Sequence, residues 1–246
     1  MTTPPLLIIT RPISRNAKLL HFCQQNDFAC EISPLLKIEP IADISGSLKK
    51  QIKNADILFF VSPTAVEICS QYIDLYKEDK IFAAVGKATE IALQKQKASP
   101  ILSPDDGNDS EAVLRHPIWQ NRTGKVLIIR GENGRAFLGN ALTELGWKVD
   151  YADIYRRIET PPAPEIWTKI AAYSGNIAVV LFSAQMSHLW LNSVPAIYAE
   201  KVKKLLYLTI HQKISDTLKQ AGCQQVITCG SETEMMKMLK KQWGKS

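Results

Sequence analysis

Polar side chains stand at four places where a predicted strand gives way to a predicted helix. These junctions are FFVSPTAVEIC (59–69), AVGKATEIAL (84–93), LIIRGENGRAFL (127–138) and LFSAQMSHLWL (181–191). They carry Ser62, Thr89, Arg130 and Ser183. A serine before a helix usually only caps it, but the free N–H groups of a helix N-terminus also bind anions. Several such ends facing one cleft would suit a ligand that carries several carboxylates.

Tyr155 stands just after the strand predicted near 148–151, within the run Ile154-Tyr155-Arg156-Arg157. At such a place a tyrosine is most often a half-buried strand residue. Its hydroxyl could also donate a proton or a hydrogen bond to a hydroxyl group that leaves a ligand. The residue pattern alone leaves both interpretations open.

Motifs for nucleotides and metals are missing. The segment from Arg130 to Arg135 has neither the G-x-G-x-x-G spacing of a dinucleotide site nor the Gly-Lys-Ser/Thr of a Walker A loop. The five cysteines are scattered without a C-x-x-C pair, so we expect buried thiols rather than disulfides or zinc ligands. Of the four histidines, only His211, at the start of a predicted helix, is a candidate for a cleft. We therefore predict no cofactor and no metal.

The elements that must position these residues are short apolar strands that alternate with helix-period segments, which is typical of βαβ units and parallel sheet. The predicted strands lie near 6–10, 29–33, 57–61, 82–85 and 98–102, and again near 126–130, 148–151, 178–182, 205–209 and 225–229. The second series follows the first at an offset of about 120 residues, which indicates an internal duplication.

The duplication aligns several of the candidate residues with each other. Arg11 and Arg130 each end the first strand of a half, Ser62 aligns with Ser183, and the segment at Leu35 aligns with that at Tyr155. Two such halves would form similar α/β layers with a cleft between them. In open α/β sheets ligands bind outside the carboxyl ends of the strands, where these residues stand.

Composition sets limits on the class of protein. The chain has 246 residues, 46% of them hydrophobic and 22% charged, which fits two globular domains. No apolar run approaches the roughly 18 residues of a membrane span, and we expect no signal peptide and a cytoplasmic location. The net charge of +6 comes from dispersed residues without a nucleic-acid-binding module, so we expect a small anionic ligand and no nucleic acid or membrane partner.

Taken together, the junctions resemble those of the uroporphyrinogen-III synthase family over nearly the whole chain. The matching segments are Ile9-Thr10-Arg11-Pro12, Ser62-Pro63-Thr64-Ala65-Val66, Val85-Gly86-Lys87-Ala88-Thr89, Ser110-Glu111, Arg130-Gly131-Glu132-Asn133-Gly134-Arg135 and Tyr155-Arg156-Arg157. Each segment is weakly specific alone, and their order and spacing carry the resemblance.

The resemblance implies an α/β fold of two similar parallel-sheet domains with flavodoxin-like, interleaved halves, joined by a two-stranded linker. One domain would comprise residues 1–36 plus 160–246, the other residues 39–155, with linker strands near 37–40 and 155–159. Pattern alone would favour two contiguous domains divided near 120.

The resemblance further implies a lyase of tetrapyrrole biosynthesis that is free of cofactor and metal. We expect a monomer, although the sequence itself does not reveal the oligomeric state. Family members cyclise hydroxymethylbilane to uroporphyrinogen III with loss of water and inversion of ring D. Whether the product feeds haem, sirohaem or cobalamin is left open by the sequence.

Carried over to this chain, the family's tyrosine that assists departure of the hydroxyl is Tyr155. The substrate-binding positions are Ser62, Thr89 and Ser183, and we add Arg11 and Arg130 at the strand ends. Relatives often have a glycine-containing turn where this chain has Thr209-Ile210-His211-Gln212, which leaves the roles of His211 and Lys213 open.

Two alternatives belong to other classes. One is a non-enzymatic small-ligand-binding protein of two α/β lobes, which the expected absence of a signal peptide disfavours. The other is an enzyme that handles nucleotides or sugar phosphates on a flavodoxin-like fold, which the missing glycine loop disfavours.

Overall fold

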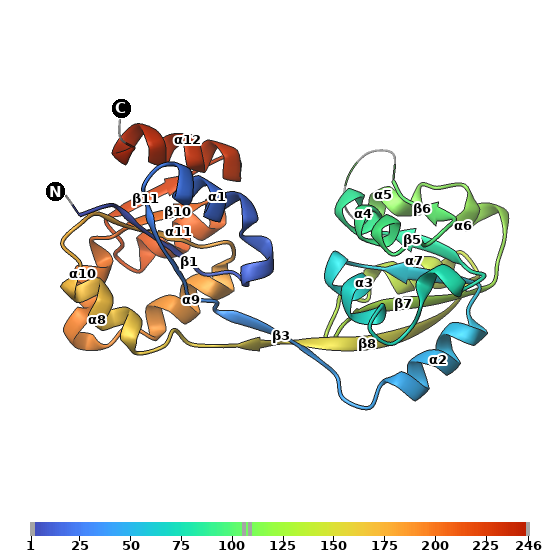
Figure 1. The fold of residues 1–246 in the computed structure, drawn as a ribbon. Helices are drawn as coiled ribbons and strands as arrows, with labels where there is room; N and C mark the ends of the chain where they lie inside the picture. Colours follow the sequence, from blue (N-terminus) through green and yellow to red (C-terminus); the bar gives the residue numbers. More distant parts are fainter. Residues whose placement is uncertain (1–2, 105–106, 108–109, 245–246) are drawn as a thin grey trace. The chain divides into compact units, whose positions relative to one another are not determined.

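The structure is a computed structural model that describes residues 3–104, 107 and 110–244. The chain divides into two compact units, coloured from blue to red along the chain in Figure 1. Unit 1 comprises Met1–Lys37 and Ile158–Ser246, and unit 2 comprises Ile38–Arg157. Each unit has its own sheet and its own core, so each is described by itself.

The sheet of unit 1 has five strands in the order β11-β10-β9-β1-β2. They are β1 (Leu6–Ile9), β2 (Ala29–Ile32), β9 (Ile177–Val180), β10 (Leu206–Thr209) and β11 (Gln225–Thr228). Neighbouring strands pair in parallel throughout. The three central strands are buried along their whole length, as expected for parallel strands covered on both faces.

The sheet of unit 2 has the order β3-β8-β7-β4-β5-β6. Its strands are β3 (Leu36–Pro40), β4 (Ile57–Phe60), β5 (Ile81–Ala84), β6 (Ile101–Leu102), β7 (Lys125–Gly131) and β8 (Lys148–Glu159). Without β3 and read from its other end, this order is β6-β5-β4-β7-β8. It matches the order β11-β10-β9-β1-β2 of unit 1 strand for strand, so that β7 is equivalent to β1 and β4 is equivalent to β9. The two sheets therefore have the same flavodoxin-like spatial order, which the duplication in the sequence predicts.

Helices cover both faces of the sheet of unit 1, because alternate residues of its strands face opposite sides. Leu6 and Ile8 belong to one core cluster, and Leu7 and Ile9 belong to another. Helices α8, α9, α10 and α11 contribute to the first cluster, and α1 and α12 contribute to the second (Figure 1). Their bounds are α1 (Ala17–Gln25), α8 (Glu165–Ala172), α9 (Ala184–Asn192), α10 (Ala199–Lys203), α11 (Gln212–Gln220) and α12 (Glu232–Trp243).

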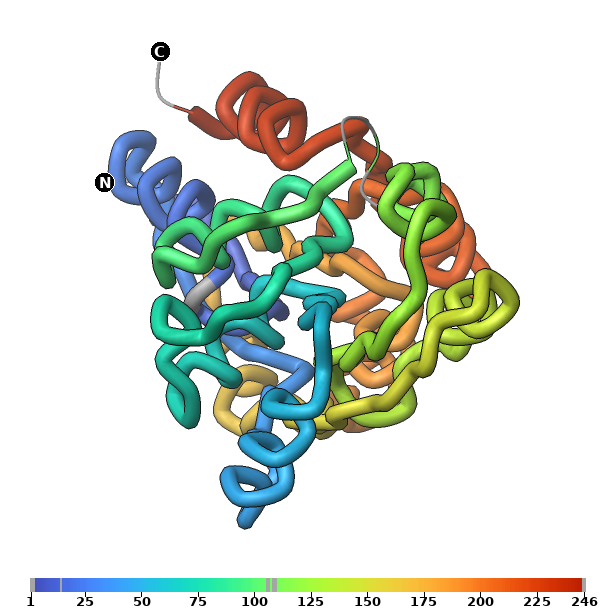
Figure 2. The backbone as a smooth tube through the Cα atoms, turned by 90° about the vertical axis from the view of Figure 1, so that its right-hand side faces the viewer, coloured from blue at the N-terminus to red at the C-terminus, as the bar shows by residue number. Residues whose placement is uncertain are grey.

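Unit 2 is built in the same way. Leu58 and Phe60 face a core shared with α2, α3 and α4, whose backbone course can be followed in Figure 2 from light blue to green. Ile57 and Phe59 face a second core that includes Trp119 and residues of α5 and α7. The helices are α2 (Ser45–Asn54), α3 (Pro63–Cys69), α4 (Lys87–Lys95), α5 (Ser110–Leu114), α6 (Ile118–Asn121) and α7 (Phe137–Glu144). Within the described residues, no helix is long and apolar enough to cross a membrane.

All ten strands predicted from the pattern are present, with ends that shift by up to three residues except at β8. Two features escape the pattern: strand β3, and the extension of β8 as far as Glu159. The amide of Ile41 donates to Ile154 O, and that of Thr160 donates to Leu35 O, so the two segments run antiparallel. A division into contiguous halves near 120 is wrong, because β4, β5 and β6 share a sheet with β7 and β8.

Candidate active site

The topology of each sheet determines where its strand-end residues meet. In unit 2, β4 leads outward to β5 and β6, whereas its neighbour β7 leads the other way to β8. The carboxyl ends of β4 and β7 therefore flank the point at which the strand order reverses, where open α/β sheets bind ligands. Ser62 follows β4 and Arg130 lies at the end of β7. In unit 1 the equivalent neighbours are β9 and β1, followed by Ser183 and Arg11.

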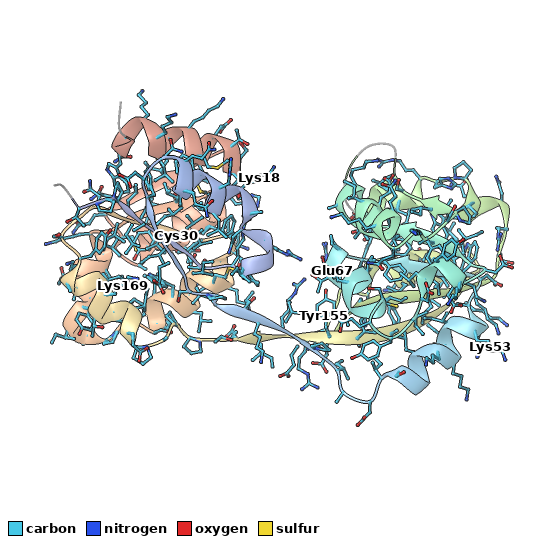
Figure 3. All side chains as sticks on the ribbon, viewed as in Figure 1. Lys18, Cys30, Lys53, Glu67, Tyr155 and Lys169 are labelled. Atoms are coloured by element: carbon cyan, nitrogen blue, oxygen red, sulfur yellow. The ribbon has the colours of Figure 1, made fainter. Side chains whose placement is uncertain are left out.

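Tyr155 is held at this point of unit 2 by an irregularity in strand pairing. Arg130 pairs with Asp153, but the next residue, Gly131, pairs with Tyr155, so that β8 carries one extra residue. Such a bulge redirects side chains. The amide of Glu132 then donates to Tyr155 O at 2.7 Å. Figure 3 labels Tyr155 on β8.

Gly131 makes room for the aromatic ring. A Cβ at position 131 would lie 2.6 Å from Cε2 and 2.7 Å from Cζ of Tyr155, well inside van der Waals contact. Tyr155 is only 2% exposed and belongs to the core shared with α3 and α4. The ring is therefore a packing element, and the hydroxyl is the part that can act chemically.

The Tyr155 hydroxyl has a partner in the neighbouring junction. Its Oη lies 3.2 Å from Ser62 Oγ, and either oxygen can be the donor. Ser62 Oγ also accepts from the amide of Ala65 at 3.1 Å and so caps α3, with Pro63 as the first helical residue. The structure thus brings together Ser62 and Tyr155, two residues 93 positions apart in the sequence.

Thr89 is buried as the third residue of α4, and its amide donates to Gly86 O at 3.0 Å. Gly86 precedes the helix, which has no side-chain cap. In unit 1, His211 precedes α11, which likewise has no side-chain cap. The junction before α4 in unit 2 and the junction before α11 in unit 1 therefore both present backbone amides at the start of a nine-residue helix. Such amides bind carboxylates.

Arg130 is engaged within unit 2. Its Nε donates to Asp153 Oδ1 at 2.7 Å and its Nη1 to Gly134 O at 3.0 Å. The guanidinium also stacks on the ring of Tyr151, 4.0 Å from the centroid. These contacts brace the loop between β7 and α7. They give Arg130 a positioning role, and a direct contact with a substrate stays a prediction.

Arg11 is held by an equivalent set of contacts in unit 1. Its Nε donates to Asn16 Oδ1 and its Nη2 to Glu232 Oε1, both at 2.7 Å, while the guanidinium lies 4.2 Å from the centroid of the Phe182 ring. In both units an arginine at the end of an equivalent strand, β1 or β7, therefore stacks on an aromatic ring and pairs with a carboxylate.

Ser183 repeats the capping geometry of Ser62. Its Oγ accepts from the amide of Met186 at 3.1 Å, at the start of α9. Leu35, the residue aligned with Tyr155 in the duplication, is fully buried and offers no hydroxyl. The two halves therefore share their caps and differ in the tyrosine, which only unit 2 has at this position.

The cysteines lie in packed surroundings. Cys23, Cys69, Cys223 and Cys229 are buried, and Cys30 is partly exposed. Burial raises the pKa of Cys69 to about 12 and that of Cys223 to about 11, which keeps both as thiols at neutral pH. Among the described residues, no group of three or more His, Cys, Asp or Glu side chains could hold a metal ion.

Three residues at these strand ends were not predicted as part of the site from the residue pattern. Gly131 lies within the glycine-containing turn of the sequence, but only the structure shows its contact with Tyr155. Ile13, 65% exposed, follows β1 in unit 1, and Phe137, 47% exposed, follows the equivalent strand β7 in unit 2. Exposed apolar side chains next to polar ones suit a ligand with apolar rings and charged substituents.

Comparison with known proteins gives a consistent result. The sequence model of the family described as uroporphyrinogen-III synthase HemD matches residues 17–239. The uroporphyrinogen-III synthase of Escherichia coli strain K12 is 28% identical over 206 residues, which cover 80% of each chain.

Two solved structures have the same fold across nearly the whole chain. One is uroporphyrinogen-III synthetase from Helicobacter pylori 26695, with a TM-score of 0.60, 12% identity and coverage of 98% of this chain and 100% of that one. The other is a mutant uroporphyrinogen III synthase from Thermus thermophilus, with a TM-score of 0.56, 15% identity and 98% coverage of both chains.

Proposed function

Because the chain belongs to the uroporphyrinogen-III synthase family, whose model spans residues 17–239, we propose that its strand-end residues carry that family's reaction. Membership makes the chain a hydro-lyase of tetrapyrrole biosynthesis that acts on hydroxymethylbilane, and this removes the non-enzymatic alternative. The observation that carries the site assignment is the Tyr155 hydroxyl, 3.2 Å from Ser62 Oγ at the strand-order reversal of unit 2.

The reaction requires loss of one hydroxyl and control of the ring closure. Hydroxymethylbilane is linear, carries eight carboxylates and closes without an enzyme to the symmetric type I isomer. In the enzyme, the terminal C–O bond breaks, the electron pair goes to the oxygen, and an azafulvene-type cation remains. Ring D then attacks through its substituted carbon to form a spiro intermediate, which reopens and recloses with ring D inverted.

Tyr155 is the group we assign to the first step. Its phenol proton passes to the departing oxygen, which leaves as water. The proton that is released during ring closure then reprotonates the phenolate. General-acid help of this kind contributes about 10²–10⁴-fold. Positioning of the ring that attacks contributes more, roughly 7–11 kcal/mol by effective-molarity arguments.

The remaining strand-end residues bind the substrate in this proposal. Ser62, Thr89 and Ser183 mark helix starts whose backbone amides suit carboxylates, the Ser183 hydroxyl adds a further donor, and Arg11 and Arg130 brace the loops beside them. Ile13 and Phe137 offer apolar contact to pyrrole rings. We further propose that the protein acts as a monomer in the cytoplasm, which gel filtration and cell fractionation can test.

Replacing Ser183 by alanine tests the binding role. Ser183 Oγ accepts from Met186 N–H, so its own proton is available to a carboxylate, and a hydrogen bond to a charged group contributes about 1.5–3 kcal/mol. We expect KM to rise about tenfold or more, with kcat nearly unchanged. The measurement is the steady-state rate as a function of hydroxymethylbilane concentration.

Ser231→Ala is the matched control. Ser231 caps α12 by accepting from the amide of Glu234 at 3.2 Å, so its loss removes a similar cap. An equal KM for both variants would show that Ser183 serves only as a helix cap.

A further inference from the structure

The hydroxyls of Ser62 and Tyr155 form a pair whose proton direction can reverse. Ser62 Oγ has one proton and two lone pairs, and one lone pair accepts the amide proton of Ala65. Across the 3.2 Å to Tyr155 Oη, either Tyr155 donates to Ser62 or Ser62 donates to Tyr155. Only in the second arrangement does the phenol proton point away from Ser62, toward another acceptor.

We infer that Ser62 is a positioning residue that donates to Tyr155 Oη when substrate is bound, and so directs the phenol proton to the departing hydroxyl. The inference rests on the proposed function, because it assigns Ser62 a role through Tyr155. A hydroxyl that accepts a hydrogen bond becomes a stronger donor, so the run from Ala65 N–H through Ser62 to Tyr155 is cooperative.

The same donor stabilises the step itself. When the C–O bond of the substrate breaks, the phenol proton moves to the leaving oxygen, water departs and negative charge develops on Tyr155 Oη. Ser62 O–H then donates to an oxygen that carries charge, and such a bond is stronger than one between neutral groups. A donor placed where charge develops lowers the barrier, because it contributes more in the transition state than in the ground state.

The surroundings fix Tyr155 while its proton changes direction. The ring lies so close to Gly131 that a Cβ at position 131 would overlap it. The N–H of Glu132 donates to the carbonyl of Tyr155 at 2.7 Å and holds the backbone in place. The ring cannot be displaced toward β7 without steric overlap. Rotation of two hydroxyl hydrogens is therefore enough to switch the pair, and no heavy atom has to move.

The test is a set of three substitutions at position 62, measured with hydroxymethylbilane. Ser62→Ala removes both cap and donor, and we expect kcat to fall about tenfold with a smaller change in KM. Ser62→Thr keeps the hydroxyl and should restore most of kcat. Ser62→Asp keeps a good cap, but an ionised carboxylate only accepts, so it should hold the phenol proton and lower kcat at least as much as Ser62→Ala.

Melting temperature separates this role from capping. Ser62→Asp should melt near the wild-type temperature, because it keeps the cap. Ser62→Ala and the control Ser231→Ala should both melt at a lower temperature. Of these two, only Ser231→Ala should keep the wild-type kcat. An Asp variant with wild-type kcat would overturn the inference, because a donor at position 62 would then be unnecessary.

A double-mutant cycle provides the decisive readout. If Ser62 acts through Tyr155, adding Ser62→Ala to Tyr155→Phe should lower kcat by less than about twofold, because the hydroxyl it serves is already gone. Losses that multiply would show that Ser62 acts independently and would overturn the inference. If Tyr155→Phe alone leaves kcat unchanged, the proposed function of Tyr155 fails first, which distinguishes the two failures.

Discussion

Tyr155→Phe is expected to lower kcat by about 10²-fold or more, because it removes the proton that we propose assists departure of the hydroxyl. The ring keeps its packing against Gly131 and the core of unit 2, so folding should be preserved. KM should change little, because the helix starts that we propose bind the carboxylates are untouched. The product formed should remain mostly type III, because in this proposal the shape of the site, and not the tyrosine, selects the carbon that attacks.

Tyr207→Phe is the control for loss of a buried tyrosine hydroxyl. Tyr207 is fully buried in unit 1, where its hydroxyl donates to Val202 O and accepts from the indole of Trp190. Its replacement should destabilise the fold by about 1–3 kcal/mol and leave kcat intact. If Tyr155→Phe likewise keeps wild-type kcat, Tyr155 is a packing residue.

Removal of residues 1–36 is expected to abolish folding of unit 1 while unit 2 stays folded. The deletion takes away β1 and β2, and β1 lies between β9 and β2 in the sheet. Leu6, Leu7, Ile8 and Ile9 are each at most 1% exposed. Full burial of such a side chain contributes about 1.5–3 kcal/mol, so the four together match the whole stability of a typical domain, about 5–15 kcal/mol.

Proteolysis and tryptophan fluorescence can follow the two units separately. Trp167 and Trp190 report on unit 1, and Trp119 and Trp147 report on unit 2. In the truncated chain, protease should digest 160–246 and leave a fragment that spans most of 38–157. A fragment of 39–155 expressed alone should fold and unfold cooperatively. Stable fragments that end near 120 would contradict this organisation.

Much of the fold can be predicted from the sequence, because its signals are local or periodic. Short apolar runs such as Leu6–Ile9 and Ile177–Val180 predict buried parallel strands, and the fold class is confirmed by the two sheets and by the solved relatives. The predicted family is confirmed by the match over residues 17–239. Strand β3 could not be predicted from the pattern, because its residues are partly or fully exposed and lack a continuous apolar run.

The site is predictable only in part. Helix capping by Ser62 and Ser183 is a local property and is confirmed. The pairing of Ser62 with Tyr155 joins residues 93 positions apart and depends on a bulge in β8, which no local pattern encodes. The carboxylate partners of Arg11 and Arg130 come from distant elements, so local pattern could not reveal these ion pairs either.

This chain is expected to turn hydroxymethylbilane into the type III isomer with its own residues alone. The most direct test is to incubate the purified full-length protein with hydroxymethylbilane in the presence of a chelator, oxidise the products and separate the isomers by chromatography. We expect predominantly uroporphyrin III, at a rate that neither chelator nor added nucleotide changes. Type I product alone, formed at the rate seen without protein, would contradict this expectation.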